Sequence, residues 1–384
     1  RIFTMFESFI RLVRDIYQTE AFIPLHEPRF LGHEKQYLVD VIDSTFVSSV
    51  GPYVTEFEHQ IANYCGAKHA IATVNGTAAL HIALLLGGVK SGEEVITQAV
   101  TFVATCNAIH YCGAEPVFVD IDTANLGLSP NALGRFLAEF SERREDGLYN
   151  INTGKRIAAC LPMHTFGHPC DLPALMRVCA EYDIPLIEDA AEALGSQSHD
   201  QHCGTFGKLG VLSFNGNKII TTGGGGMILT DDDTLAQHAR HLTTTAKSPH
   251  AWCFEHDQIG YNYRMPNLNA ALGLAQLEQL PDFLVNKRSL AQHYQAWAQS
   301  NQVNILCEPP QSRSNFWLNA LLLDNQEQRD AFLAFSNEHG IMTRPLWNLM
   351  VDLPMYQHSQ HDGLLNSRQV AACLVNIPSS AVNR

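Results

Sequence analysis

Hydrophobic and polar positions follow two different periods along the first two thirds of the chain. Between residues 70 and 230, short runs rich in Val, Ile, Leu and Ala alternate with longer stretches of helical periodicity. Strands that alternate with helices predict a mostly parallel sheet covered by helices on both faces. We expect strands at residues 70–74, 94–98, 116–120, 156–163, 185–189, 211–214 and 227–230, and helices at residues 77–86, 104–112, 129–140 and 171–182.

The pattern changes after Thr230. Residues 267–280 are rich in Ala and Leu and predict a helix that ends near Pro281, because proline disrupts a helix interior. Helices at 283–297 and 328–339 and a strand at 316–323 then outline a small α+β domain. At the other end, the amphipathic residues 1–17 predict a helix packed on the body or on a partner subunit. The predicted division is an N-terminal helix (1–22), a large domain (23–265) and a small C-terminal domain (266–384).

Composition and charge exclude several classes of partner. The 384 residues are 46% hydrophobic, and their formal net charge of -14 argues against binding to nucleic acid or to an anionic membrane surface. No apolar run reaches the roughly 18 residues that a membrane-spanning helix needs. No signal-peptide pattern is present, so we expect a cytoplasmic protein. Its ten cysteines form no C-x-x-C pair and are expected to be reduced thiols.

One short loop carries three side chains that zinc can bind. His164, His168 and Cys170 all lie within seven residues, but no second pair of ligands follows them. We therefore expect no metal site.

A turn at Asn75-Gly76-Thr77 follows the first predicted strand and opens a helix. Gly76 permits a close approach of the backbone, and the helix start presents free N–H groups at the positive end of a dipole. Such a turn suits a phosphate. The alternative, an ordinary turn with Thr77 as helix cap, fits the local sequence equally well.

Two charged residues follow later strands of the same predicted sheet. Asp189 stands at the carboxyl end of a strand, where α/β proteins bind ligands and where a carboxylate could hold a cationic ring nitrogen. Alternatively, Asp189 caps the alanines that follow it. Lys218 stands between a strand and the run Gly223 to Gly226; a lysine near cations or in an apolar pocket becomes a nucleophile toward carbonyls. Taken alone, this segment also fits a flexible turn.

The order of these features is typical of fold-type I enzymes that use pyridoxal 5'-phosphate (PLP). From about residue 23 to residue 380, the chain resembles the DegT/StrS family of sugar aminotransferases. The resemblance rests on the segments 75–80 (NGTAAL), 101–105 (TFVAT), 116–122 (PVFVDID), 188–191 (EDAA), 213–218 (SFNGNK) and 260–265 (GYNYRM). It implies the aspartate-aminotransferase-like α/β fold, with a large, mostly parallel-sheet domain and a small α+β C-terminal domain.

The resemblance also implies a role for each matching residue. Lys218 would form the Schiff base with PLP and move protons, while Asp189 would pair with the pyridinium nitrogen. The cofactor phosphate would be held by Gly76, Thr77 and Ser213, and by Asn262 of a neighbouring subunit in a homodimer with shared active sites. Phe102 matches the aromatic residue that stacks on the PLP ring, although Phe102 could also be a core aromatic and Asn262 a loop-capping amide.

Two positions depart from the family pattern. Glu192 stands where many members carry Gln or His against the 3-oxygen of PLP, so its carboxylate must be protonated or point elsewhere. Gly224 replaces a common acidic residue. Two further residues are open: His164 could line the cofactor pocket or bond to the backbone, and Arg344 could meet a diphosphate, although a surface ion pair is the expected role.

The expected reaction transfers an amino group from L-glutamate, through pyridoxamine phosphate, to C4 of a nucleotide-linked 4-keto-6-deoxy sugar. The sequence of residues 213–222 most resembles the branch of the family that acts on UDP-linked N-acetylated sugars, as in legionaminic acid and bacillosamine synthesis. GDP-4-keto-6-deoxymannose is the alternative substrate. A related sugar dehydratase would carry His in place of Lys218. A non-catalytic PLP-binding regulator is disfavoured because Lys218 and Asp189 are both present, and a nicotinamide enzyme because no G-x-G-x-x-G follows the first strand.

Overall fold

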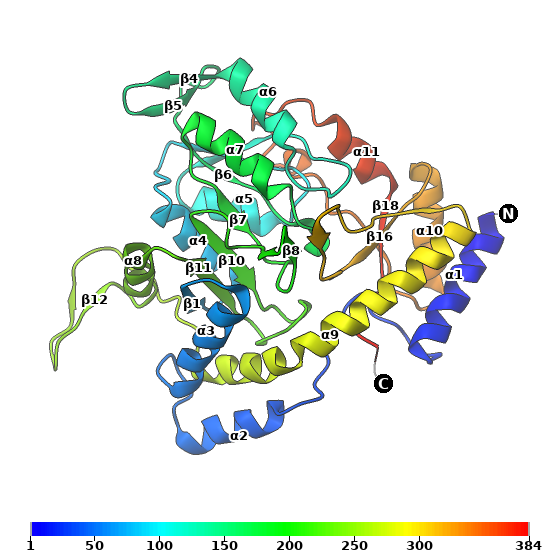
Figure 1. The fold of residues 1–384 in the computed structure, drawn as a ribbon, viewed down its shortest axis with the longest axis horizontal. Helices are drawn as coiled ribbons and strands as arrows, with labels where there is room; N and C mark the ends of the chain where they lie inside the picture. The colour runs from blue at the N-terminus through cyan, green and yellow to red at the C-terminus, as the bar shows by residue number, and fades with distance from the viewer. Residues whose placement is uncertain (1, 383–384) are drawn as a thin grey trace.

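A twisted central sheet organises the computed structural model, which describes residues 2–382 (Figure 1). The domain limits expected at residues 1 and 384 lie outside this range. Two parallel bridges, Cys160 to Leu186 and Met163 to Asp189, join two smaller sheets into one. All neighbours run parallel except at β11. In spatial order the strands are β1 (His69–Thr73), β11 (Gly226–Thr230), β10 (Leu209–Ser213), β7 (Ile187–Asp189), β6 (Ile157–Leu161), β2 (Glu94–Thr97) and β3 (Glu115–Phe118).

Helices cover both faces of this sheet. One face packs against α4 (Gly76–Leu86), α5 (Val103–Tyr111) and α8 (Asp233–Thr243). The other face packs against α3 (Pro52–Cys65), α6 (Pro130–Phe140), α7 (Leu172–Tyr182) and the start of α9 (Asn267–Ser300). The predicted strands and helices of this region are therefore confirmed, and so is the fold class. Ser129 caps α6, since its hydroxyl accepts a hydrogen bond from the N–H of Ala132.

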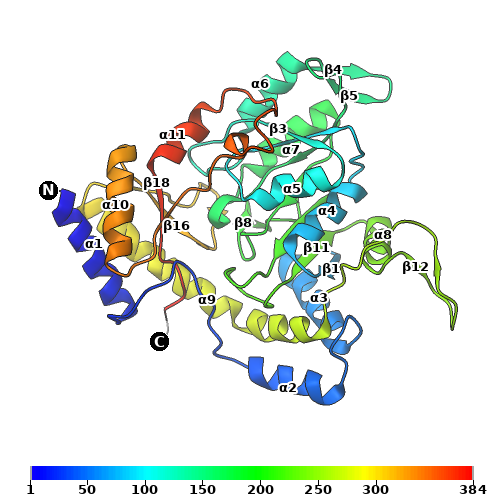
Figure 2. The same ribbon diagram turned by 180° about the vertical axis from the view of Figure 1, so that it is seen from behind.

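A second, antiparallel sheet lies beside the first. Its order is β14 (Asn304–Ile305), β16 (Asn319–Leu322), β18 (Leu374–Ile377) and β17 (Arg344–Pro345). It is flanked by α10 (Gln326–Glu338), α11 (Leu365–Cys373) and α1 (Ile2–Tyr17) (Figure 2). The buried Phe6, Phe9 and Val13 of α1 pack into its core. The N-terminal amphipathic helix is thus packed on the body of its own chain.

The central sheet with its helices forms a large unit, and the antiparallel sheet with its helices forms a small unit. The long helix α9 crosses the molecule from the large unit to the small one (Figure 1). Its first half packs on α2 (Glu34–Ser44) and α3, and its second half packs on α1 and β14. The prediction that a helix ends at Pro281 is wrong, because the helix continues through that residue. Burial of Leu277, Leu280 and Phe283 on both sides of Pro281 outweighs the lost backbone hydrogen bond. Since α9 belongs to both units, the division after residue 265 stays a prediction.

Short elements complete the fold. Hairpins join β4 (Ser141–Arg144) to β5 (Gly147–Asn150) and β12 (Lys247–Ser248) to β13 (Glu255–His256), and the β12 hairpin projects from the body (Figure 1). The remaining elements are β8 (Gln197–Ser198), β9 (Gln201–His202), β15 (Ser312–Arg313) and the 3-10 turns η1 (Thr165–Gly167) and η2 (Met350–Asp352). Within residues 2–382, no helix has both the length and the apolar character needed to cross a membrane.

A buried carboxylate ties α3 to the strand that precedes the site. Glu58 is 4% exposed and accepts hydrogen bonds from the N–H of Ala72 and from the guanidinium groups of Arg240 and Arg264.

We expect Glu58→Ala to lower the free energy of unfolding by about 3–5 kcal/mol, because it leaves the largely buried Arg264 without a carboxylate partner. Urea denaturation measures this. The exposed pair of Glu142 and Arg144 provides the control, and Glu142→Ala should cost less than about 1 kcal/mol. Equal losses for the two variants would show that the Glu58 cluster is not a stabilising contact.

Candidate active site

The carboxyl ends of the parallel strands meet the start of α4 around one cavity of about 300 Å³. Asp189 ends β7, Ser213 ends β10, and Gly76 begins α4 directly after β1. The cavity is lined by Asn75, Gly76, Thr77, Leu80, Thr101, Phe102, Ala104, Thr105, Met163, Asp189, Ala191, Glu192, Ser213, Asn215, Asn217, Lys218, Trp317 and Trp347. The structure therefore brings together seven of the eight residues expected from the sequence; Asn262 is the exception.

Lys218 reaches into this cavity from the segment after β10. Its Nζ atom lies 3.7 Å from Oε2 of Glu192 and 4.2 Å from the centre of the Trp317 ring, over the ring face. The Trp317 indole N–H donates to the carbonyl of Asn217, the residue before the lysine, at 2.7 Å. A carboxylate and an aromatic face both favour an ammonium group, so the two side chains form a cradle for the lysine.

Asp189 lies at the floor of the cavity and is 3% exposed. One carboxylate oxygen accepts from the Thr105 hydroxyl at 2.7 Å, and the other accepts from the N–H of Ala191 at 3.2 Å. Thr105 is itself 2.6 Å from the Thr101 hydroxyl. Burial raises the pKa of Asp189, while these hydrogen bonds and the charge of Lys218 oppose that rise. A cationic partner in the cavity would favour the ionised form.

The start of α4 also lines the cavity. The Asn75 side chain caps the helix by accepting from the N–H of Ala78, which leaves the first N–H groups directed past the helix end. Gly76 is required for space: a Cβ atom there would lie 2.9 Å from Cβ of Ser213. Backbone donors, the Thr77 and Ser213 hydroxyls and a helix N-terminus together suit a phosphate.

Aromatic side chains close the cavity from the side. Phe102 is 51% exposed, and its ring centre lies 6.4 Å from that of Trp347, which in turn packs on Phe166 at 5.3 Å. Phe102 is thus available to a flat ligand rather than buried in the core.

Asn262 does not reach this cavity within one chain. It is exposed, and its backbone pairs with Thr244 near the base of the β12 hairpin. Its expected role across a subunit interface stays a prediction. Arg344 is also outside the cavity: it is exposed and donates to the Asn337 side chain and the Thr343 carbonyl. Gly224 stands in a backbone turn, where its carbonyl accepts from Asn269 at 3.4 Å.

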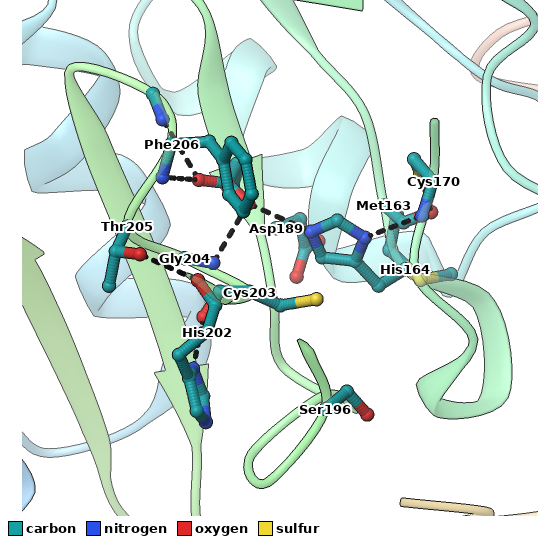
Figure 3. A network of polar contacts seen from close by, with 12 residues as sticks. Met163, His164, Cys170, Asp189, Ser196, His202, Cys203, Gly204, Thr205 and Phe206 are labelled. Atoms are coloured by element: carbon teal, nitrogen blue, oxygen red, sulfur yellow. Dashed lines mark hydrogen bonds and ion pairs between the residues drawn. The ribbon is translucent and has the colours of Figure 1, made fainter. Parts of the chain in front are cut away.

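His164 is fully buried and is not among the residues that line the cavity. Figure 3 shows it beside Asp189 and Cys170. Its Nδ1 atom accepts from the N–H of Cys170, and Nε2 lies 3.0 Å from Oε1 of Glu188. Burial would raise the pKa of Glu188, but hydrogen bonds from His164 and from the N–H groups of Gly204 and Gly207 lower it overall. Among residues 2–382, no three His, Cys, Asp or Glu side chains are arranged to hold a metal ion.

Sequence reasoning did not single out Thr105, Trp317 or Trp347. Thr105 lies within a quoted motif, where its helical spacing from Thr101 could have indicated a polar pair facing one side. Trp317 and Trp347 come from the second unit, more than 90 residues beyond Lys218, and nothing local in the sequence connects them to the site.

Comparison with known proteins agrees with this geometry. The profile of the DegT/DnrJ/EryC1/StrS aminotransferase family matches residues 30–382. The chain belongs to this family. It is a PLP-dependent sugar aminotransferase, as its curated relatives also indicate.

The relatives cover most of both chains. GDP-perosamine synthase of Escherichia coli O157:H7 is 37% identical over 335 residues, which is 87% of each chain. The putative pyridoxal phosphate-dependent aminotransferase EpsN of Bacillus subtilis is 37% identical over 87% of this chain and 84% of its own. Among solved structures, the aminotransferase TlmJ from Streptoalloteichus hindustanus superposes with a TM-score of 0.84 at 28% identity, covering 94% of both chains.

The residues present fit PLP. The cavity offers a lysine amine, a buried carboxylate for the ring nitrogen, an exposed aromatic face and a helix start where Gly76 leaves room for an anion.

We expect Thr105→Val to weaken PLP binding by about 10- to 100-fold, because the loss of a hydrogen bond to a buried carboxylate costs roughly 1.5–3 kcal/mol. The lost bond also lets the pKa of Asp189 rise further. On acidification, the affinity of the variant for PLP should therefore begin to fall at a higher pH than the affinity of the wild type. Fluorescence titration with PLP across pH measures both effects.

Thr105→Ser keeps the hydroxyl and is the matched control, with near wild-type affinity expected. If the valine variant binds PLP as the wild type does at every pH, Thr105 does not support Asp189.

Proposed function

We propose that this chain transfers the amino group of L-glutamate to C4 of a nucleotide-linked 4-keto-6-deoxy sugar. The observation that carries the proposal is the convergence of Lys218, Asp189 and the α4 start on one cavity. PLP supplies the electron sink and the temporary nitrogen carrier of this chemistry when it is bound.

The residues of the chain hold and activate this chemistry. Asp189 would offer a carboxylate to the ring nitrogen, and the groups at Gly76, Thr77 and Ser213 would bind the phosphate. Phe102 contributes a flat face. Lys218 would supply the amine that holds the cofactor through its carbonyl carbon and would move the proton at the substrate carbon. Its position between Glu192 and Trp317 keeps its amine within the cavity.

The rim of the cavity supports a sugar as the acceptor. Asn215 and Asn217 are exposed there and offer amide donors and acceptors, while Trp347 and Phe102 offer apolar faces. Amides suit hydroxyl or acetamido groups, and aromatic faces suit the C–H side of a sugar ring.

Two nucleotide sugars compete as substrates. We favour a UDP-linked 2-acetamido-4-keto-2,6-dideoxyhexose, because the sequence of residues 213–222 resembles the branch of the family that acts on such sugars. GDP-4-keto-6-deoxymannose is the second candidate, because relatives from Escherichia coli O157:H7 and Vibrio cholerae, at 37% and 36% identity, are named GDP-perosamine synthases.

We expect L-glutamate to bleach the visible band of the lysine-bound cofactor and to produce the band of pyridoxamine phosphate. Lys218→Ala should lack the first band altogether. Absorbance spectra of purified protein with PLP measure this, with D-glutamate as the control donor. A wild type without a lysine-dependent band would refute the assignment of Lys218.

The same spectra identify the acceptor. Protein converted to the pyridoxamine form is mixed in turn with the UDP-linked and the GDP-linked 4-keto sugar, and the substrate restores the visible band. If only the GDP-linked sugar restores the visible band, the second candidate is the substrate and our preferred one is not. If neither sugar restores the band, neither 4-keto sugar is the acceptor.

We further propose a homodimer with shared active sites. Large apolar side chains are exposed on the surface of the described chain, among them Phe46, Val50 and Ile259 at 55%, 71% and 81%. Exposed apolar surface of this kind is typical of a subunit interface. Asn262, three residues after Ile259, would then reach the partner's cofactor phosphate.

A mixing experiment tests this arrangement. Lys218→Ala and Asn262→Ala should each be poorly active alone. When equal amounts re-associate at random, about half of the dimers are mixed. Each mixed dimer of a two-fold assembly contains one intact site and one site that lacks both residues, so about a quarter of all sites should be intact. Full activity of Asn262→Ala alone, or no recovery on mixing, would contradict the shared site.

A further inference from the structure

Glu192 has one carboxylate oxygen fixed and the other directed at the lysine. Oε1 accepts from the N–H of Phe166 at 2.8 Å. Oε2 lies 3.7 Å from Nζ of Lys218, and the two side chains are 2% and 12% exposed. The contact is an ion pair slightly longer than a hydrogen bond, as is common for catalytic pairs without bound substrate.

The other carboxylate of the cavity forms no ion pair with the lysine, because within residues 2–382 the ion pair of Lys218 is with Glu192. Asp189 and Glu192 are the acidic residues among those that line the cavity. The oxygens of Asp189 instead accept from the Thr105 hydroxyl and from the N–H of Ala191, which leaves further acceptor positions for a ligand. Oε2 of Glu192 is thus the acceptor that Lys218 faces.

We propose that Glu192 is a catalytic residue that takes the proton of the Lys218 ammonium group. One N–H bond of the ammonium breaks, one O–H bond forms at Oε2, and the ion pair becomes a neutral amine and a neutral carboxylic acid. The amine then has the free electron pair that attack on a carbonyl requires. The inference deepens the proposed function, because it rests on Lys218 as the attacking lysine.

The surroundings make Glu192 a stronger base than an ordinary carboxylate. Burial raises the pKa of Glu192 to about 7, with the nearby charge of Asp189 adding to the rise and Lys218 and the N–H of Phe166 opposing it. A base whose pKa lies near neutrality accepts and releases protons readily at working pH. Trp317 favours the ammonium form by its ring face, so the lysine is held in reach until the proton leaves.

The pH dependence follows from these charges. Above about pH 7, Glu192 is ionised and accepts the proton; below it, Glu192 is protonated and cannot. His26 also faces Lys218, but burial first, and then the charges of Lys287, Arg29 and Lys218, lower its pKa well below the ordinary value. The His26 ring therefore stays neutral across the range and adds no second inflection.

The rate at which cofactor-free protein captures PLP tests the proposal. Stopped-flow absorbance between about pH 5.5 and pH 9 follows the appearance of the lysine-dependent band. We expect the wild-type rate to rise through about pH 7 and level off. Glu192→Gln should be slower by at least about 100-fold at pH 7.5 and should lack that rise. Its amide oxygen still accepts from Phe166, so a structural role would be preserved in this variant.

Two further variants make the result decisive. Glu192→Ala with added formate should recover rate in proportion to formate concentration, whereas Glu192→Gln with formate should not. Glu145→Gln, at an exposed site on the β4–β5 turn, should match the wild type throughout. Glu192→Gln with a wild-type rate and pH profile would overturn the role of Glu192 while leaving Lys218 in place. A wild type without any lysine-dependent band would instead overturn the proposed function itself.

Discussion

Two adjacent carboxylates on the central strand β7 are buried. The site depends on which groups stabilise the negative charge of each. Glu188 and Asp189 are 0% and 3% exposed. Because successive side chains of a strand point to opposite faces, one carboxylate must be satisfied by the protein core and the other is free to face a ligand. An uncompensated buried charge would be too costly to retain, so the network around Glu188 is a condition for the position of Asp189.

Glu188 meets this condition with backbone donors. The N–H groups of Gly204, Phe206 and Gly207 and the His164 ring surround its two oxygens (Figure 3). Through these contacts, Glu188 connects β7 with the loop after β6 and with the segment before β10. Asp189 is placed by the same strand, and its backbone carbonyl also accepts from the N–H of His164. The acid at the floor of the cavity is therefore held by contacts on the far side of its own strand.

The sequence predicts the large unit well because its signals are local. Apolar runs bounded by turn residues give the strands, and residues such as Asp189 and Ser213 stand at strand ends that a parallel sheet must bring to one edge. Prediction fails where tertiary contacts decide. Pro281 does not end α9, because both sides of the helix are buried around it, and the short hairpins β4–β5 and β12–β13 have too few residues for a clear alternating pattern. Trp317 joins the site through a contact that no local pattern encodes.

One asparagine explains how that distant tryptophan reaches the lysine. Asn315 is fully buried; its side-chain NH₂ group donates to the carbonyls of Glu192 and Leu194, and its oxygen accepts from the N–H of Trp317. A single amide thus ties the segment that carries the carboxylate to the segment that carries the aromatic face. Trp317 is fixed at two more points, since its carbonyl accepts from the buried Lys287 and its indole donates to Asn217. The environment of Lys218 is consequently built from both units of the fold, and a change in how the small unit packs would move the ring face and the carboxylate relative to the amine they share.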